Sequence, residues 1–135
     1  MRPDDVTVLD MEASIEHLSR GTLRDVETLL IVAEPYFRAL ETLGRTVPLA
    51  RELGIPQMYV VANKVKSARD EATIREYSAR LGMEVLGVVP FDEAAQEADR
   101  NNQALVEYMP SAPAVLAIAR MVDVLEKGAK IPSIR

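Results

Sequence analysis

The stretch Met58-Tyr59-Val60-Val61-Ala62-Asn63-Lys64 decides the fold, because it is an unbroken apolar run that stops at a polar turn. Short apolar runs of this kind occur at residues 6–9, 28–33, 58–62 and 85–89. They are rich in β-branched residues and alternate with segments of helical period, which is typical of βαβ units. None alternates between apolar and polar residues, so we expect strands that are covered on both sides. The sequence therefore predicts an α/β fold, a parallel sheet with helices on both faces.

The first predicted helix spans residues 36–53. Pro35 suits a first helical position and Gly54 suits a C-terminal cap. Pro48 removes one backbone hydrogen bond from the interior, so we expect a kink or two shorter helices that meet near residues 46–48.

Three more helices follow, at residues 70–81, at residues 92–100 and from residue 114 to about 127. The last ends at Gly128, and we expect it to pack on the sheet through apolar residues at helical spacing. These residues are Val115, Ile118, Ala119, Val122 and Leu125.

Length and composition indicate one folded domain. The chain has 135 residues, 48% of them hydrophobic and 27% charged, which is typical of a globular protein. We expect a single α/β domain over residues 1–129 and a flexible tail over residues 130–135. The net charge of −5 argues against nucleic acid as a partner, since such binding depends on lysine and arginine.

The chain has no cysteine and one histidine, His17, so we expect no tight transition-metal site built from this chain alone. No apolar run approaches the roughly 20 residues that cross a bilayer, and the first residues lack the apolar core of a signal peptide. We therefore expect no membrane association and a cytoplasmic location.

The first polar turn begins at Asp10, directly after the run at residues 6–9. A carboxylate at the end of a buried strand can hold the water shell of Mg²⁺ beside nucleotide phosphates. Glu12, Ser14 and Glu16 would then lie in a loop that responds to a γ-phosphate. Asp10 can equally cap a following helix, because aspartate is a favoured N-cap residue.

The second polar turn contains Asn63 and Lys64. An asparagine amide can donate to and accept from a purine in one plane, and a lysine stem can lie along the base. The alternative is an Asx-turn beside a solvated lysine.

The third polar turn is Pro90-Phe91-Asp92, which could form one wall of a base pocket. Alternatively, Asp92 is only the N-cap of the next helix. All three turns follow successive parallel strands, so we expect them at one edge of the sheet, where ligands of such folds bind.

The run Asp10-Met11-Glu12-Ala13-Ser14-Ile15-Glu16-His17-Leu18-Ser19-Arg20-Gly21-Thr22 resembles the switch II region of the CooC-type ATPases, the nickel-insertion accessory proteins of carbon monoxide dehydrogenase. These belong to the deviant P-loop group with nitrogenase iron protein and the septum-site and partitioning ATPases. The likeness continues through Val32-Ala33-Glu34-Pro35, Asn63-Lys64-Val65 and Val88-Val89-Pro90-Phe91-Asp92, in the family's order.

The resemblance implies the C-terminal portion of a P-loop NTPase fold, a dimer that binds ATP or ADP with Mg²⁺ and acts on a carbon monoxide dehydrogenase-like metalloenzyme. Asp10 would be the catalytic carboxylate that holds Mg²⁺ through water, and Glu12, Ala13 and Ser14 would belong to switch II. The nucleotide-binding residues would be Asn63, Lys64, Pro90, Phe91 and Asp92.

No Gly-x-x-x-x-Gly-Lys-[Ser/Thr] loop occurs in the chain, and Ser14 stands where the family usually has glycine. We therefore expect no ATP hydrolysis by this chain alone, and an N-terminal P-loop half or a homodimer as its partner. The alternative is a non-catalytic interaction module that keeps the fold and binds a maturation partner.

Overall fold

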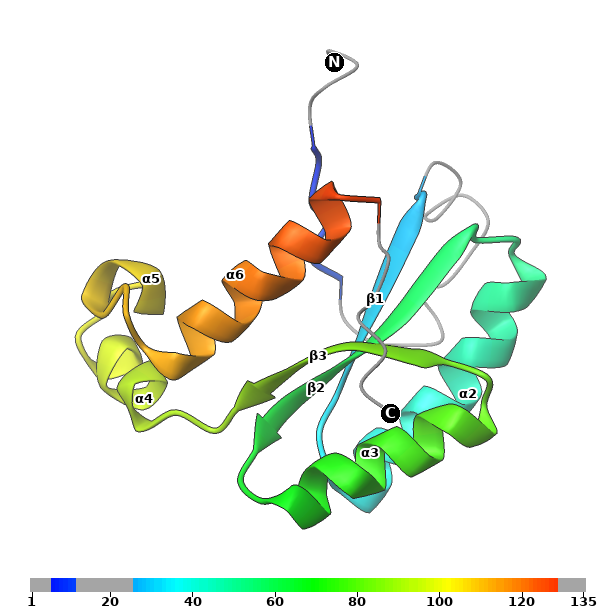
Figure 1. The fold of residues 1–135 in the computed structure, drawn as a ribbon, viewed down its shortest axis with the longest axis horizontal. Coiled ribbons are helices and arrows are strands. Elements are labelled where there is room, and N and C mark those ends of the chain that lie inside the picture. The colour runs from blue at the N-terminus through cyan, green and yellow to red at the C-terminus, as the bar shows by residue number, and fades with distance from the viewer. Residues whose placement is uncertain (1–5, 12–25, 129–135) are drawn as a thin grey trace.

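The computed structural model describes residues 6–11 and 26–128. Its sheet has three parallel strands in the order β1-β2-β3, with β1 at Thr28–Ala33, β2 at Gln57–Val65 and β3 at Glu84–Pro90 (Figure 1). Crossover connections join each strand to the next, so all three carboxyl ends point the same way. The predicted parallel α/β fold is confirmed.

The helices of the described residues are α2 (Phe37–Glu52), α3 (Ala68–Arg80), α4 (Glu93–Arg100), α5 (Leu105–Tyr108) and α6 (Pro113–Glu126). Each longer predicted helix is present, and α5 was not predicted. Ser67 caps α3 by accepting a hydrogen bond from the Asp70 amide at 3.2 Å. Gly54 and Gly82 follow α2 and α3 with positive φ, as glycine readily does at the end of a helix.

Helix α2 differs from its prediction in two respects. It begins at Phe37 rather than at residue 36, so Pro35 lies before it, and of the two outcomes expected at Pro48 the division into two shorter helices does not occur. Val47 and Ala50, on either side of the proline, are both 0% exposed. Tertiary packing on both sides of Pro48 thus holds the helix together despite the missing backbone donor.

Residues 6–9 do not form the predicted strand. Their apolar side chains are largely exposed, at 84% for Val6 and 85% for Val8. A strand needs a neighbour for its backbone hydrogen bonds, and the sheet of the described residues gives this segment none.

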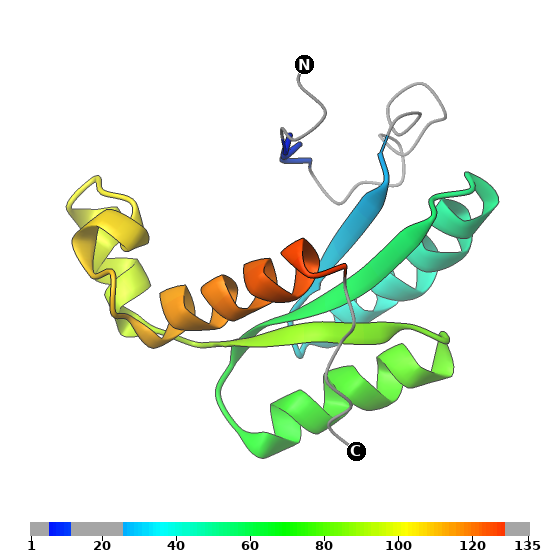
Figure 2. The ribbon, with the colours of Figure 1, turned by 45° about the horizontal axis from the view of Figure 1, so that its top comes forward.

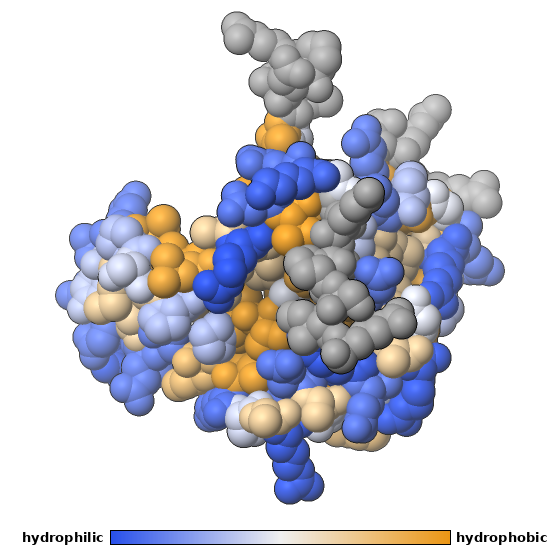
Figure 3. Space-filling model, in the orientation of Figure 1, coloured by the Kyte–Doolittle hydropathy of each residue, from blue (hydrophilic) through white to orange (hydrophobic). Residues whose placement is uncertain are grey.

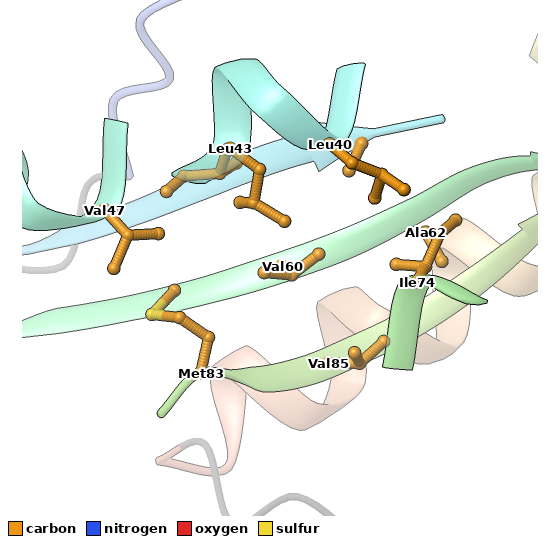
Figure 4. Packing of buried hydrophobic residues seen from close by; sticks show 10 residues of the cluster. Leu40, Leu43, Val47, Val60, Ala62, Ile74, Met83 and Val85 are labelled. Atoms are coloured by element: carbon orange, nitrogen blue, oxygen red, sulfur yellow. The ribbon is translucent and has the colours of Figure 1, made fainter. Parts of the chain in front are cut away.

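Helices α2 and α3 lie on one face of the sheet and α6 lies on the other (Figure 2), and a hydrophobic cluster fills the space on each face. The larger lies beneath α2 and α3 and includes Leu43, Val47, Val60 and Ile74, each at most 1% exposed (Figure 4). The smaller lies between β2, β3 and α6. Helices therefore lie on both faces, as the sequence predicts; on the second face α6 supplies the buried helical residues of the cluster, and Leu105 of α5 packs against it.

Helix α6 packs through a different face from the predicted one. Ala114, Ala117 and Met121 are buried, whereas Ile118 and Val122 are 48% and 45% exposed. Met121 lies over Gly87 of β3, where a Cβ would come within 2.5 Å of the Met121 Cγ. The close approach favours Met121 and the small residues of α6, whereas Leu116, Ile118 and Val122 remain on the surface.

Candidate functional site

The carboxyl edge of the sheet gathers the polar residues at the ends of β1, β2 and β3. Ala33 pairs in register with Ala62, and Val65 pairs with Pro90. Glu34, Asn63 and Phe91 therefore belong to adjacent strand ends. Asn63 and Lys64 lie within β2, just before its last residue, rather than in a turn after it, and Pro90 ends β3. The prediction that they lie at one edge with Phe91 and Asp92 is confirmed, and Glu34 after β1 joins them.

A β-bulge shapes the end of β2. Ala62 pairs with Val88 and Val65 with Pro90, so three steps along β2 match two steps along β3. Lys64 lies in this irregular stretch with a φ of 55°, the left-handed region that residues with a Cβ rarely adopt. Bulges and unusual backbone conformations are frequent beside binding sites, where they redirect side chains.

Lys64 forms an ion pair with Glu34 across the ends of β1 and β2. Its Nζ lies 2.9 Å from the Glu34 Oε1, and the Lys64 side chain is 56% exposed. The hydrogen bond and the charge of Glu34 raise the pKa of Lys64 above the ordinary value of 10.5. The lysine therefore stays charged at neutral pH with its head held at the β1 side of the edge.

Asn63 is half-buried beside this ion pair. No side-chain hydrogen bond engages its carboxamide among the residues that the structure describes. An amide in this state can still donate and accept in one plane, which is the pattern that a purine edge requires.

Phe91 forms the other side of the edge. Its backbone N–H donates to the Val65 oxygen at 2.9 Å, which extends the pairing of β2 and β3 by one residue. The Lys66 ammonium lies 4.5 Å from the centroid of the Phe91 ring, within the range of a cation–π interaction. The half-buried ring is thus fixed at both its backbone and its face.

Asp92 has a structural role that the sequence indicates only in part. One carboxylate oxygen, Oδ1, accepts from the Ala94 amide at 2.9 Å and caps α4. The other, Oδ2, accepts from the Ala114 amide at 3.1 Å and so also holds the first turn of α6. The predicted N-cap is confirmed, and the second cap joins two helices that are 22 residues apart.

Asp10 does not join this group. It is exposed, and the next residue, Met11, packs against a cluster that includes Leu29 and Met58, the second residues of β1 and β2. This is the amino end of the sheet, opposite to Asn63, and Figure 1 draws the segment in dark blue away from the arrowheads of β2 and β3. The expectation that all three turns share one edge therefore holds for two of them.

The other predicted switch II residues, Glu12, Ala13 and Ser14, lie outside the described residues. Within residues 6–11 and 26–128, no three acidic, histidine or cysteine side chains come together as a metal site would require.

Glu34 also belongs to this edge, although the polar turns considered one at a time did not indicate it as a site residue. It follows Ala33 just as Asn63 follows Ala62, and these two alanines are partners in the parallel register. The available signal was therefore the alignment of the two strand ends.

Residues 3–106 match the family model described as the CobQ/CobB/MinD/ParA nucleotide binding domain. An uncharacterized ATP-binding protein of Methanocaldococcus jannaschii is 44% identical over 93 residues, 69% of this chain and 36% of that protein. The carbon monoxide dehydrogenase accessory protein CooC of Rhodospirillum rubrum is 39% identical over 104 residues, 77% of this chain and 39% of that protein.

Solved structures show the same fold. The MinD protein of the Aquifex aeolicus MinC:MinD complex aligns with a TM-score of 0.70 at 19% identity, over 88% of this chain and 51% of that one. The septum site-determining protein MinD of Pyrococcus horikoshii, complexed with Mg-ADP, aligns with a TM-score of 0.62 at 21% identity, over 80% of this chain and 45% of that one. The chain thus spans less than two-fifths of these curated relatives and about half of these solved chains.

No helix among the described residues is long and apolar enough to cross a membrane.

Proposed function

Because the chain belongs to the CobQ/CobB/MinD/ParA nucleotide-binding domain family, we propose that it supplies the adenine side of an ATPase site. The observation that carries the proposal is the bulge at the end of β2, where Lys64 adopts a left-handed backbone and the preceding Asn63 makes no side-chain hydrogen bond among the described residues. Pro90 and Phe91 would form the opposite wall of the base pocket. Asp92 would act there by fixing the turn, since both of its oxygens hold backbone amides.

The phosphates require groups that this sequence does not contain. Phosphoryl transfer depends on a loop of backbone amides and a lysine that neutralise charge, and no such loop motif occurs in the chain. We propose that an N-terminal P-loop half supplies it. The outer edge of β1 supports this, because no strand of the described residues pairs with it and its Leu30 and Val32 are 39% and 58% exposed.

Asp10 would hold Mg²⁺ through water, and Glu12, Ala13 and Ser14 would form switch II, once residues 6–9 join the sheet. The exposed apolar side chains of that segment support such a pairing. The Mg²⁺ would be a cofactor shared with the partner half.

The similarity to the carbon monoxide dehydrogenase accessory protein supports a narrower role. We propose that the assembled ATPase works as a dimer in the cytoplasm, in nickel insertion into a carbon monoxide dehydrogenase-like metalloenzyme. Nickel would then be the cargo of the assembly rather than a ligand of this chain alone, which has no cysteine.

Calorimetric titration with Mg-ADP and Mg-ATP tests the nucleotide site. The chain is titrated alone and with a supplied N-terminal half, beside the variants Asn63→Ala and Gln96→Ala. Gln96 is an exposed amide on α4 and is the matched control. We expect Asn63→Ala to weaken binding about tenfold, because a paired amide–base contact contributes roughly 1–3 kcal/mol, and Gln96→Ala to have no effect.

Hydrolysis that appears only when both halves are present would support the complete proposal. Absence of nucleotide binding under all these conditions would contradict it.

A second candidate function is a non-catalytic interaction module. The exposed apolar residues of the α5 region favour it, with Val106 at 57%, Tyr108 at 38% and Met109 at 40% (Figure 3). A chain that binds a maturation metalloenzyme but no nucleotide, in either the presence or the absence of a P-loop half, would support this alternative.

A further inference from the structure

We infer that Glu34 is a positioning residue for the purine base, which it orients through its ion pair with Lys64. The inference rests on the proposed nucleotide site and adds to it a residue from a neighbouring strand. Glu34 would not touch the nucleotide; it would hold the backbone and side chain that do.

The backbone of β2 is strained at Lys64. A lysine with a φ of 55° is disfavoured because its Cβ crowds the following carbonyl. Such a conformation persists where surrounding contacts hold it in place. In a regular strand the side chains of Asn63 and Lys64 would point to opposite faces, and the bulge breaks that alternation.

The ion pair between Glu34 and Lys64 differs from the other ion pairs of the described residues. Those other pairs each join side chains three or four residues apart in a single helix. The Glu34–Lys64 pair joins the ends of two strands that are 30 residues apart in the sequence. It therefore constrains tertiary geometry, whereas the others constrain only local helix.

The backbone next to Glu34 is held firmly in the sheet. Glu34 directly follows Ala33, which is 1% exposed and pairs in register with Ala62 at 0%. The Glu34 side chain is 32% exposed, less than that of Lys64. The carboxylate is thus a well-anchored point to which the longer lysine is tied.

The ion pair with Glu34 determines where the charge of Lys64 lies. Held by Glu34, the ammonium stays at the β1 side, 2.9 Å from the Glu34 Oε1, and the methylene stem is tied to the edge at its outer end. Without Glu34, the ammonium could turn toward the phosphates of a nucleotide and the stem would leave the base. Glu34 thus favours recognition of the base and opposes direct phosphate contact.

Adenosine and Mg-ADP together test this role, because only one of them carries phosphates. Binding is followed by NMR through the shift of the Asn63 side-chain amide, in the wild-type chain and in Glu34→Gln, Lys64→Met and the double variant. Glu41→Gln is the matched control, since Glu41 pairs only with Arg45 on the surface of α2. Thermal unfolding of each variant confirms that it is folded.

We expect Glu34→Gln to weaken adenosine roughly two- to fivefold, as suits a partly exposed ion pair, and to weaken Mg-ADP by less, because the released ammonium can reach the phosphates. Lys64→Met should weaken adenosine by a similar factor, and adding Glu34→Gln to it should cause no further loss, because the two residues act as one unit. Glu41→Gln should leave both affinities unchanged.

Three results would overturn the inference. Unchanged adenosine affinity in Glu34→Gln would remove the positioning role and leave the nucleotide site intact. Tighter Mg-ADP binding with unchanged adenosine binding would show that Glu34 acts only by repelling phosphate charge. Failure of the wild-type chain to bind either compound, both alone and with the supplied N-terminal half, would remove the proposed nucleotide site and this inference with it.

Discussion

Replacement of Asp92 by alanine separates a structural role of this carboxylate from a nucleotide-binding one. The residue begins α4 and also holds the first turn of α6 through two backbone amides. Both helices would lose a cap at once. We expect the free energy of unfolding to fall before any ligand is considered.

The magnitude follows from the two contacts. A side-chain N-cap contributes about 1 kcal/mol, which applies to the 2.9 Å contact with the Ala94 amide. A hydrogen bond to a charged group contributes about 1.5 kcal/mol, which applies to the 3.1 Å contact with the Ala114 amide. Asp92 is half-buried, so we take the lower end of that range and expect a total loss of about 2–3 kcal/mol.

Urea denaturation followed by circular dichroism measures this loss. With a slope of about 2 kcal/mol per molar urea, the midpoint should fall by about 1–1.5 M. Asp92→Asn should lose about half as much, because its amide keeps one oxygen for one of the two caps. Asp99→Ala removes an exposed carboxylate near the end of α4 and should change stability by no more than about 0.5 kcal/mol.

A loss below about 0.5 kcal/mol in Asp92→Ala would refute the double-cap reasoning, since surface substitutions have effects of that size. If nucleotide affinity nevertheless fell, Asp92 would be a ligand-binding residue in its own right. If stability fell as expected and Asp92→Asn bound nucleotide normally, its role would be to fix the turn.

Three further predictions concern other positions. Gly87→Ala should destabilise the fold by about 1–3 kcal/mol in urea denaturation, because the new Cβ would lie 2.5 Å from the Met121 Cγ; unchanged stability would show that α6 moves freely. Ser78→Ala should raise the thermal midpoint, because the buried Ser78 hydroxyl has no hydrogen-bond partner among the described residues; a lower midpoint would reveal a partner. Glu34 raises the pKa of Lys64, so the contribution of this pair should be complete below pH 10.5 and be lost as pH rises through the raised value; ¹⁵N NMR titration of the ammonium should show its pKa falling toward 10.5 in Glu34→Gln, and an unchanged pKa would contradict this cause.

The candidate site could be predicted from the sequence where it depends on strand ends. A parallel sheet places the residues after its strands at one edge, so Asn63 and Phe91 could be assigned to one site. The partner of Lys64 could not be assigned, because Glu34 reaches it through a register that no local pattern encodes. The second cap of Asp92 could not be predicted either, because it depends on a tertiary contact.

The sequence by itself determined the three parallel strands of the described residues and the longer helices that cover them. Local patterns were sufficient for this prediction. The spacing of apolar residues indicates which backbone conformation buries apolar area, and glycine and aspartate indicate where helices end and begin.

Only the tertiary structure decided which apolar face of α6 is buried and what residues 6–9 do. Helix α6 has apolar residues on two faces, and the space left by Gly87 admits Met121 and the small side chains rather than Ile118. A strand likewise requires a neighbour, and none of the described strands pairs with residues 6–9. Both outcomes depend on the shape of a distant surface, which the periodicity of a single segment does not contain.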